Sequence, residues 1–400
     1  MKERRITVSG VGCCLLDRIF NGIDFASPNF AKYLSKQPSD GGLLPGRLEF
    51  EEQFEQFMGQ KFPSVLHEMT DGRAADCENI GGPCIVGLIG AAQLTHTISD
   101  IRYYGCCGDD EVGTQLLELL RKTPVDISHF RPEVGSETPS TSVLSDASYD
   151  NGHGERTFVN TIGAAWKFLP EEIDDDFFRS DICMFGATAL VPTIHHSLDT
   201  LLPKAKQQGA FTLVTTVYDT INERRQVERW PLGDSDDSYR YTDLLVTDRE
   251  EALRLSGTTR IDDALRFFHD KGVGAAVVTN GAEDVKYYAQ SPIFVQTTEY
   301  GSMPISAAVG EELRQGRKGD TTGCGDNFAG GMLASLVMQL HKGTHPLDLE
   351  EAIKWGVVAG GFTCFQFGGT FFESYPGEKM EKLLPYYTKY CQQIKLSSVQ

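Results

Sequence analysis

Gly319-Asp-Thr-Thr-Gly-Cys-Gly-Asp-Asn-Phe328 is a glycine-rich turn that runs into an apolar segment with helical spacing, Phe328–His341. A tight Gly-x-Gly turn that opens a helix exposes backbone N–H groups at the positive end of the helix dipole, which makes an anion site. Asp326 follows the turn directly, so its carboxylate can accept a proton from a substrate hydroxyl while the amides hold a phosphoryl group. The alternative is that Asp326 only caps the helix, an interpretation that the two glycines and Asp320 make weaker.

The rest of the chain alternates between short β-branched runs and segments with helical spacing. The predicted strands are Ile6–Val11, Phe211–Val217, Leu244–Val246 and Ala275–Thr279. The predicted helices are Val112–Arg121, Leu198–Gln207, Glu250–Leu255, Ile261–His269 and Phe328–His341. Such alternation favours an α/β fold with a mostly parallel sheet that is covered on both faces.

Three regions depart from this alternation. Residues 18–75 are polar and aromatic, with one predicted helix over Glu49–Met58. Residues 138–162 predict a hairpin, in which Thr141–Tyr149 and Glu155–Thr161 are the two strands, and hairpins inserted in such chains often form a lid. The charged segment Thr220–Thr242 is predicted to be a solvent-exposed loop.

Composition excludes several classes of function. The 400 residues include 37 Lys and Arg against 56 Asp and Glu, a net charge of −19, which argues against binding of nucleic acid or of anionic membranes. The longest nearly uncharged stretches, Ile80–Leu94 and Gly356–Phe372, are too short to span a bilayer. The 10 cysteines include no Cys-x-x-Cys, so we do not expect a zinc site. Scattered cysteines in a large acidic chain are typical of free thiols, so we expect a reducing, cytoplasmic location.

Asp320-Thr-Thr-Gly-Cys-Gly-Asp326 resembles the C-terminal signature of the ribokinase (PfkB) family of carbohydrate and nucleoside kinases, whose usual form is Asp-Thr-x-Gly-Ala-Gly-Asp. The resemblance implies that Asp326 is the catalytic base. It also implies that Gly323, Cys324 and Gly325 form the anion hole, with Cys324 in place of the common small residue. Asp320 and Thr322 would lie near the monovalent-cation site, for K⁺, that some members have.

The same resemblance implies the overall architecture. It predicts a single ribokinase-like domain over residues 1–400, a three-layer α/β/α sandwich with a mostly parallel central sheet and a small β lid. The lid elements would be inserted at about residues 18–48 and 138–162. Gly105–Gly113 resembles a Gly-x-x-Gly-x-Asp-x-x-Gly stretch of the family. Lids of this family sometimes pair, so a homodimer through the lid is an open expectation.

The acceptor side is predicted from the first strand and from one glycine pair. Gly10–Asp17 resembles the first strand of the family and the aspartate that grips substrate hydroxyls, and Gly81-Gly82 resembles its substrate loop. A dinucleotide turn at Gly10-x-Gly12 is the rival interpretation, but it lacks the third glycine. Where the family commonly has an asparagine, this chain has Val86, which cannot bind a hydroxyl.

Two further side chains are candidates for the acceptor site. Asn79 either replaces the missing asparagine or is a turn residue. Arg156, on the returning strand of the hairpin, either reaches substrate or phosphate when the lid closes or has no role at the surface.

The nucleotide side is predicted from three places. Asp248-Arg-Glu-Glu251 resembles an Asn-x-x-Glu element of the family and would hold Mg²⁺ through water, whereas without the family it would be a solvated first helical turn. Thr279-Asn-Gly281 resembles the loop that contacts the nucleotide phosphates, although Asp284 replaces its later glycine. Gly368 is expected to flank the nucleotide or cation site.

Taken together, these resemblances imply an ATP-dependent kinase that acts on a hydroxyl of a small sugar or sugar-like molecule. A nucleoside kinase is the first alternative, because the segment 18–75 is laid out like that of adenosine kinases. Its aromatic residues, which are Phe20, Phe25, Phe30 and Tyr33, either stack on a base or form the core of the lid. A kinase-like binding protein without turnover is the second alternative, favoured by Val86, Asp248 and Asp284.

Overall fold

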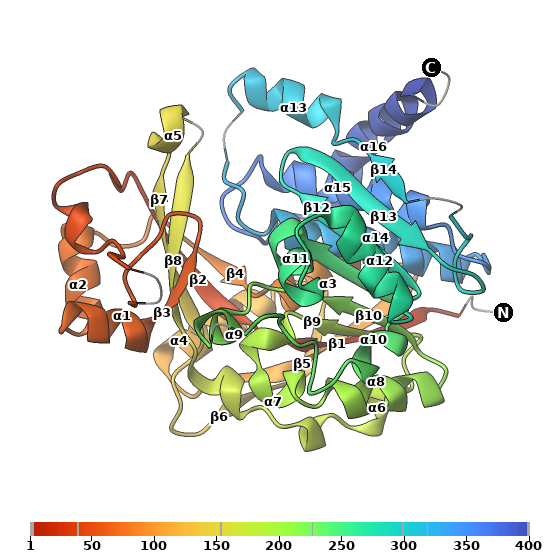
Figure 1. Cartoon of the computed structure of the whole chain (residues 1–400), viewed down its shortest axis with the longest axis horizontal. Helices are drawn as coiled ribbons and strands as arrows, with labels where there is room; N and C mark the ends of the chain where they lie inside the picture. Colours follow the sequence, from red (N-terminus) through yellow and green to blue (C-terminus); the bar gives the residue numbers. More distant parts are fainter. Residues whose placement is uncertain are drawn as a thin grey trace.

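A nine-stranded sheet runs through the larger part of the protein (Figure 1). The computed structural model describes residues 4–37, 40–152, 154–225, 227–297, 300–317 and 319–397. The strand order is β14-β13-β12-β11-β10-β9-β1-β5-β6, parallel except at the β12–β13 and β13–β14 pairs. The strands are β1 (Ile6–Gly12), β5 (Ser99–Gly108), β6 (Asp126–Glu133), β9 (Ile182–Gly186), β10 (Phe211–Thr215), β11 (Leu244–Asp248), β12 (Ala275–Asn280), β13 (Glu283–Ala289) and β14 (Gly301–Met303).

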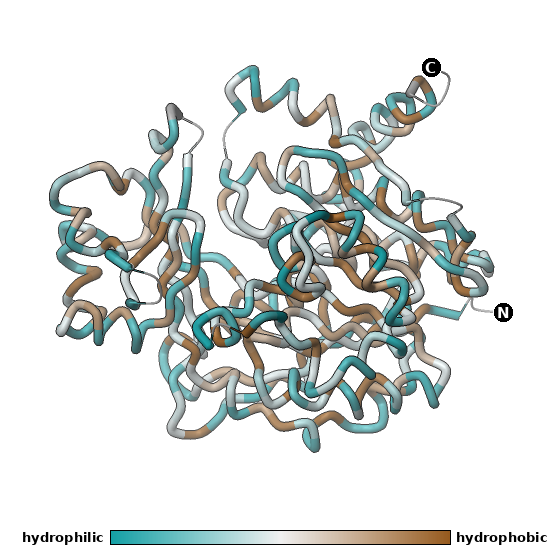
Figure 2. Tube along the Cα trace, viewed as in Figure 1, coloured by the Kyte–Doolittle hydropathy of each residue, from teal (hydrophilic) through white to brown (hydrophobic). Residues whose placement is uncertain are grey.

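Helices cover both faces of this sheet, and an apolar core lies under each layer (Figure 2). One layer consists of α3 (Pro83–Thr95), α4 (Glu111–Leu120), α13 (Ala307–Arg314), α14 (Cys324–His341), α15 (Leu349–Thr363) and α16 (Glu378–Ser397). The other consists of α6 (Asp175–Phe178), α7 (Pro192–His195), α8 (Leu198–Gln207), α10 (Asp237–Arg240), α11 (Arg249–Ser256) and α12 (Ile261–Asp270). The predicted α/β/α sandwich is therefore confirmed.

A second, five-stranded sheet stands beside the first, at the left of Figure 1, with the order β3-β8-β7-β2-β4. Its strands are β2 (Leu15–Asn21), β3 (Leu48–Phe50), β4 (Cys77–Gly81), β7 (Ser140–Asp146) and β8 (Glu155–Thr161), and it carries α1 (Glu51–Met58) and α2 (Phe62–Met69). The predicted hairpin is confirmed, since β7 and β8 pair antiparallel. The sheet uses residues from both predicted lid ranges and also takes in β4.

The aromatic residues of the segment 18–75 form the core of this second unit. Phe20, Phe25, Phe30 and Tyr33 are all buried in one cluster with Phe54 of α1. The rings of Phe25 and Phe30 stack with centroids 4.7 Å apart. Because these rings pack against one another, the structure supports the lid-core interpretation of these residues rather than a base-stacking platform.

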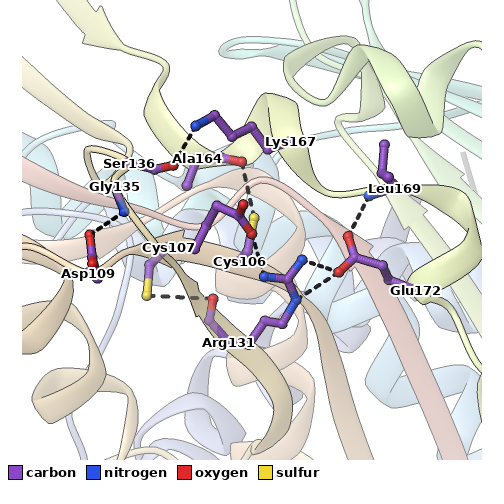
Figure 3. A network of polar contacts seen from close by, with 11 residues as sticks. Cys106, Cys107, Asp109, Arg131, Gly135, Ser136, Ala164, Lys167, Leu169 and Glu172 are labelled. Atoms are coloured by element: carbon purple, nitrogen blue, oxygen red, sulfur yellow. Dashed lines mark hydrogen bonds and ion pairs between the residues drawn. The ribbon is translucent and has the colours of Figure 1, made fainter.

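Both ends of the β7–β8 hairpin are tied to the large sheet. Asp110 accepts hydrogen bonds from the amides of Thr138 at 2.9 Å and Gly113 at 2.8 Å, so the stretch Gly105–Gly113 holds the chain just before β7. Figure 3 shows how the segment after β8 is held in turn.

In that network Cys106 Sγ donates to the carbonyl of Ala164 at 3.1 Å, and Arg131 Nε donates to Glu172 Oε1 at 2.7 Å (Figure 3). The hairpin is thus anchored at its base on β5 and β6, while its tip extends away from them (Figure 1).

One predicted loop is wrong. The segment Thr220–Thr242 contains α9 (Thr220–Arg224) and α10, and Trp230 and Tyr239 are only 1% and 0% exposed. Its charged residues lie outside while its large rings join the core beneath α8 and α12. The remaining short helices are η1 (Phe30–Lys32), α5 (Tyr149–Gly152), η2 (Gly163–Lys167), η3 (Pro170–Glu172) and η4 (Thr188–Leu190). Within the residues that the structure describes, no helix is long and apolar enough to cross a bilayer.

Candidate active site at the carboxyl edge of the large sheet

The predicted site residues come from several elements that meet at one edge of the large sheet. Parallel strands bring their carboxyl ends to the same edge, where ligands commonly bind in open α/β sheets. Asp248 ends β11 and lies opposite Thr279 of β12 in the register, so the predicted metal and nucleotide residues are neighbours. Asp17 follows β1 on β2, and α14 begins close by with the quoted glycine turn.

The start of α14 has the form of an anion site. Gly323 is the residue before the helix, at φ +75°, and a Cβ there would lie 2.4 Å from Gly369 Cα. Only glycine fits that conformation in that space. The amides of Gly323 and Gly325 donate no hydrogen bond among the described residues, whereas the amide of Cys324 turns back to the carbonyl of Thr321 at 3.3 Å. Two of the three predicted amides are thus free, at the positive end of the dipole.

Asp326 is the third residue of α14 and is half-buried beside these amides. Burial raises the pKa of its carboxyl to about 7, because the charged form loses hydration. A carboxyl with a pKa near neutrality can both hold and release a proton at ordinary pH. That property suits a general base.

Asp17 lies close enough to Asp326 for the two charges to interact. Its side chain is 6% exposed, and its pKa is raised to about 8, first by burial and then by the negative charges of Asp326 and Asp320. A hydrogen bond from Thr141 and the positive charge of Arg156 oppose that rise. The first strand and the α14 turn, more than 300 residues apart in the chain, therefore share one electrostatic environment.

The glycine pair Gly81-Gly82 makes room for Asp17. A Cβ at Gly81 would lie 2.2 Å from Asp17 Oδ2, and one at Gly82, where φ is +103°, would lie 2.3 Å from the carbonyl oxygen of Cys13. Gly82 also precedes α3, whose Val86 is buried. The pair therefore lets the backbone of β4 pass directly beside the Asp17 carboxylate.

Asn79 lies opposite Asp17 in the β2–β4 register and is buried. Its Nδ2 donates to the carbonyls of Phe367 and Thr370, both at 3.1 Å, while its Oδ1 has no partner among the described residues. The amide nitrogen is therefore committed to the 367–370 loop, and only Oδ1 remains for a ligand. Gly368, in the same loop, donates from its amide to Asp320 Oδ2 at 3.3 Å, which places it beside Asp320.

Arg156 reaches from the second sheet to the loop before α14. Its Nη1 donates to Thr322 Oγ1 at 2.8 Å, and the amide of Thr322 donates to Asp320 Oδ1 at 2.8 Å. A guanidinium on the Thr322 hydroxyl already supplies a positive charge there. In this conformation the Thr322 hydroxyl is bonded to Arg156 and Asp320 lies beside it, and their part in a monovalent-cation site stays a prediction.

Asp248 and Glu251 form a reciprocal cap at the start of α11. The Glu251 amide donates to Asp248 Oδ1 at 2.8 Å, and the Asp248 amide donates to Glu251 Oε2 at 3.4 Å. Burial, and then the charge of Asp248, raise the pKa of Glu251 to about 8, with a smaller contribution from Asp326. Glu251 Oε1 accepts no hydrogen bond from any described residue, so this pair combines a capping role with a free carboxylate oxygen.

Thr279 and Gly281 lie where β12 turns into β13. Gly281 is exposed, with φ +56°, and Thr279 is half-buried. Asp284 is not part of this turn but lies on β13, where its carboxylate accepts a hydrogen bond from Ser302 at 2.8 Å. The departure at Asp284 therefore falls outside the turn itself.

Asn327 and Lys379 also belong to this site, although the sequence pattern does not single out either of them. Asn327 Nδ2 donates to the carbonyls of Gly323 at 3.0 Å and Gly369 at 2.7 Å, and Lys379 Nζ donates to Asn327 Oδ1 at 2.8 Å. Lys379 is 1% exposed, and burial lowers its pKa to about 8. Asn327 could have been chosen from its place next to Asp326, but nothing near Lys379 in the sequence indicates that it points into this site.

Comparison with known proteins gives one family. The sequence matches the family described as "pfkB family carbohydrate kinase" over residues 80–374. Fructokinase-1 of Oryza sativa subsp. japonica is 25% identical over 336 residues, which are 81% of this chain and 94% of that protein.

The solved structures that share this fold include an adenosine kinase and a ribokinase. The adenosine kinase of Sinorhizobium meliloti has a TM-score of 0.69 and 21% identity, covering 94% of this chain and 99% of its own. The Arabidopsis thaliana ribokinase solved with ribose and ATP has a TM-score of 0.60 and 16% identity, covering 96% and 99%.

Proposed function

This chain belongs to the pfkB family of carbohydrate kinases, and from that premise we propose that it transfers the γ-phosphoryl group of ATP to a hydroxyl of a small sugar or sugar-like molecule. Membership makes the chain a phosphotransferase with an alcohol group as acceptor. The relatives named fructokinases support a sugar as that acceptor. The acceptor and the roles of individual residues are our proposal.

The observation that carries the proposal is the junction of free amides and a carboxyl at the start of α14. The amides of Gly323 and Gly325 are unpaired, and Asp326, with a pKa raised to about 7 by burial, stands one residue further on. In the proposed reaction these two free amides stabilise charge on the moving phosphoryl, while Asp326 takes the proton of the acceptor hydroxyl. Preorganised donors act without reorganising during the reaction, which is why their position matters.

The acceptor is proposed to lie against Asp17 and the Gly81-Gly82 backbone. Asp17 is a buried carboxyl on β2, the strand that follows β1, and its electrostatic coupling to Asp326 supports a common substrate between them. Oδ1 of Asn79 is the second oxygen that we propose accepts a hydrogen bond from a substrate hydroxyl. It would take the place of the asparagine that many family members have at the position of Val86. Arg156 would bring the second sheet down over the phosphoryl group as a lid and exclude water.

ATP is proposed to lie along the turn Thr279–Gly281, with its phosphates toward Gly323–Gly325. The oxygens of Asp248 and Glu251 suit Mg²⁺, which such sites hold mostly through water, and the free Oε1 of Glu251 fits this arrangement. When bound, Mg²⁺ neutralises negative charge on the phosphates. The proposed reaction uses no monovalent cation, and the positive charge beside the Thr322 hydroxyl is that of Arg156.

A nucleoside kinase with the same chemistry is the second candidate, supported by the fold shared with adenosine kinases. The aromatic residues of the segment 18–75 do not support it, since they are buried in a core. Release of ADP from Mg-ATP should therefore be measured across a panel of sugars and nucleosides. Stimulation by a sugar supports the proposal, stimulation by nucleosides alone selects the second candidate, and silence with intact ATP binding selects a binding protein without turnover.

A further inference from the structure

Two cysteine sulfurs lie 3.4 Å apart where α14 begins and α15 ends. Cys324 is the first residue of α14, and Cys364 follows the last residue of α15 directly. Both cysteines are free, and both residues are half-buried rather than enclosed in the core. The sulfurs of a disulfide are about 2.0 Å apart, so a closure of about 1.4 Å would join the pair.

The packing of the two helices fixes this proximity. A Cβ at Gly331 of α14 would lie 2.4 Å from the carbonyl oxygen of Trp355, and one at Gly360 of α15 would lie 2.9 Å from that of Cys324. The backbones of α14 and α15 are thus in direct contact through glycines. This close packing of the helix backbones holds the two cysteines near each other.

The loop before α14 is hydrogen-bonded to the segment that follows α15. The amide of Asp320 donates to the carbonyl of Gln366 at 2.8 Å, and a Cβ at Gly319 would lie 2.6 Å from the carbonyl oxygen of Cys364. Cys364 therefore lies beside the loop that carries the free amides, but it does not itself provide one of these amides. Any cross-link between the two cysteines acts directly on that loop.

We propose that Cys324 and Cys364 are a modification site at which a peroxide converts the two thiols into a reversible disulfide, and that closing this disulfide stops phosphoryl transfer. The first half of the proposal rests on the geometry of the pair alone. The second half rests on the proposed function, because it assigns the amides of Gly323 and Gly325 to the phosphoryl group.

The chemistry balances with hydrogen peroxide as oxidant. One thiol loses its proton and its sulfur attacks a peroxide oxygen, so that the O–O bond breaks and a sulfenic acid and one water result. The sulfur of the second thiol then attacks the sulfenic sulfur, the S–O bond breaks, and the hydroxyl leaves with the thiol proton as a second water. The two sulfurs together lose two electrons, which the peroxide gains. A dithiol reductant reverses the change by thiol–disulfide exchange.

Transfer stops because Cys324 lies inside the amide turn. Drawing its sulfur toward Cys364 moves its backbone, and with it the amides of Gly323 and Gly325 on either side. Donors that stabilise a developing charge lose most of their effect when they are displaced by a fraction of an ångström. A Cβ placed at Gly325 would meet nothing within 4 Å, so there is open space on that side of the backbone.

The test compares the full chain before and after treatment with hydrogen peroxide. Free thiols are blocked, the protein is digested, and mass spectrometry detects a cross-linked peptide pair containing residues 324 and 364. We expect the pair to form, kcat for ADP release to fall at least tenfold, and dithiothreitol to restore both. Cys364→Ser should keep basal activity and become resistant, whereas the matched control Cys391→Ser, half-buried on α16, should stay sensitive.

The results that overturn the proposal are distinct from failure of the proposed function. Absence of the cross-linked pair, or equal sensitivity of Cys364→Ser, contradicts the modification site even if the enzyme is an active kinase. Formation of the pair with unchanged turnover contradicts the effect on transfer. Formation of the pair in a protein that phosphorylates no acceptor supports the modification site and contradicts the proposed function. Cys324→Ala, which keeps the backbone amide, removes the pair from the other side should Cys364→Ser fail to fold.

Discussion

Arg156 of β8 donates a hydrogen bond from Nη1 to Oγ1 of Thr322, 2.8 Å away, and this contact joins the second sheet to the loop before α14. The two residues lie 166 positions apart in the chain, Arg156 on a strand of the second sheet and Thr322 two residues before the start of α14. Arg156 lies on the side of the site where we propose that the phosphoryl group is transferred. Its guanidinium can therefore both hold the lid closed and stabilise the negative charge of the transferred group.

Replacing Arg156 with Met is expected to lower kcat/KM by about tenfold to a hundredfold, the equivalent of one hydrogen bond to a charged group. Thr322→Val removes the other partner and should lower kcat/KM in the same direction. The double variant should lose less than the sum of the two effects, because the singles remove one shared contact. Full additivity in this cycle, measured by steady-state kinetics, would show that the contact has no part in turnover.

Lys379→Met tests the support beneath the amide turn. The substitution leaves Oδ1 of Asn327 buried without its donor, at an expected cost of about 1–3 kcal/mol in the free energy of unfolding. Because Asn327 holds the carbonyls of Gly323 and Gly369, kcat should fall as well. Chemical denaturation and steady-state kinetics measure the two effects.

Lys382→Met, on an exposed part of the same helix, is the matched control for Lys379→Met. It should change the unfolding free energy by less than about 0.5 kcal/mol. Equal effects of the two substitutions would contradict a special place for Lys379.

Gly81→Ala is expected to displace the Asp17 carboxylate. The added methyl would lie 2.2 Å from Asp17 Oδ2 and 2.5 Å from Leu15 Cδ1, so the unfolding free energy should fall by about 1–3 kcal/mol and the KM for the acceptor should rise. Gly310→Ala is the control, because its methyl would meet nothing within 4 Å and α13 favours alanine. An unchanged acceptor KM in Gly81→Ala would remove Asp17 from the acceptor site.

The rate should depend on pH through Asp326. Burial places its pKa at about 7, and only the deprotonated form can take the hydroxyl proton, so kcat/KM should fall by about tenfold for each pH unit below that value. Asp17, with a pKa raised to about 8, adds a second ionisation in the wild-type profile. The profile of Asp17→Asn should therefore keep the limb near pH 7, and a flat profile between pH 5 and 7 in that variant would refute the base assignment.

The local parts of this structure were predictable from sequence. α8 has the bounds that its apolar spacing predicts, and β1 and the β7–β8 hairpin lie where their alternation predicts them. α14 begins at Cys324, four residues before the predicted start at Phe328, because the glycine turn itself supplies its first turn. Local spacing and turn chemistry decide these elements.

What the sequence does not indicate depends on contacts between distant segments. Trp230 and Tyr239 stand among charged residues, and only the surrounding helices show that their rings are buried. The role of Asn79 as a clamp on the 367–370 loop, and the approach of Lys379 to Asn327, likewise arise from tertiary packing. The spacing of apolar residues around these positions does not indicate their contacts, so the neighbouring sequence alone could not identify them.

The central claim is that Asp326 is the general base of a kinase, and Asp326→Asn tests it most directly. ADP release from Mg-ATP should be measured with the best acceptor of the panel, together with ATP binding and thermal unfolding. Asp262→Asn is the matched control, since Asp262 lies in the first turn of α12 as Asp326 does in α14. We predict that Asp326→Asn binds ATP and folds normally but loses about a hundredfold to ten-thousandfold in kcat, while Asp262→Asn retains full turnover. An Asp326→Asn enzyme within tenfold of the wild-type kcat would contradict the claim and leave Asp326 as an acidic residue of the first helical turn that favours the helix dipole.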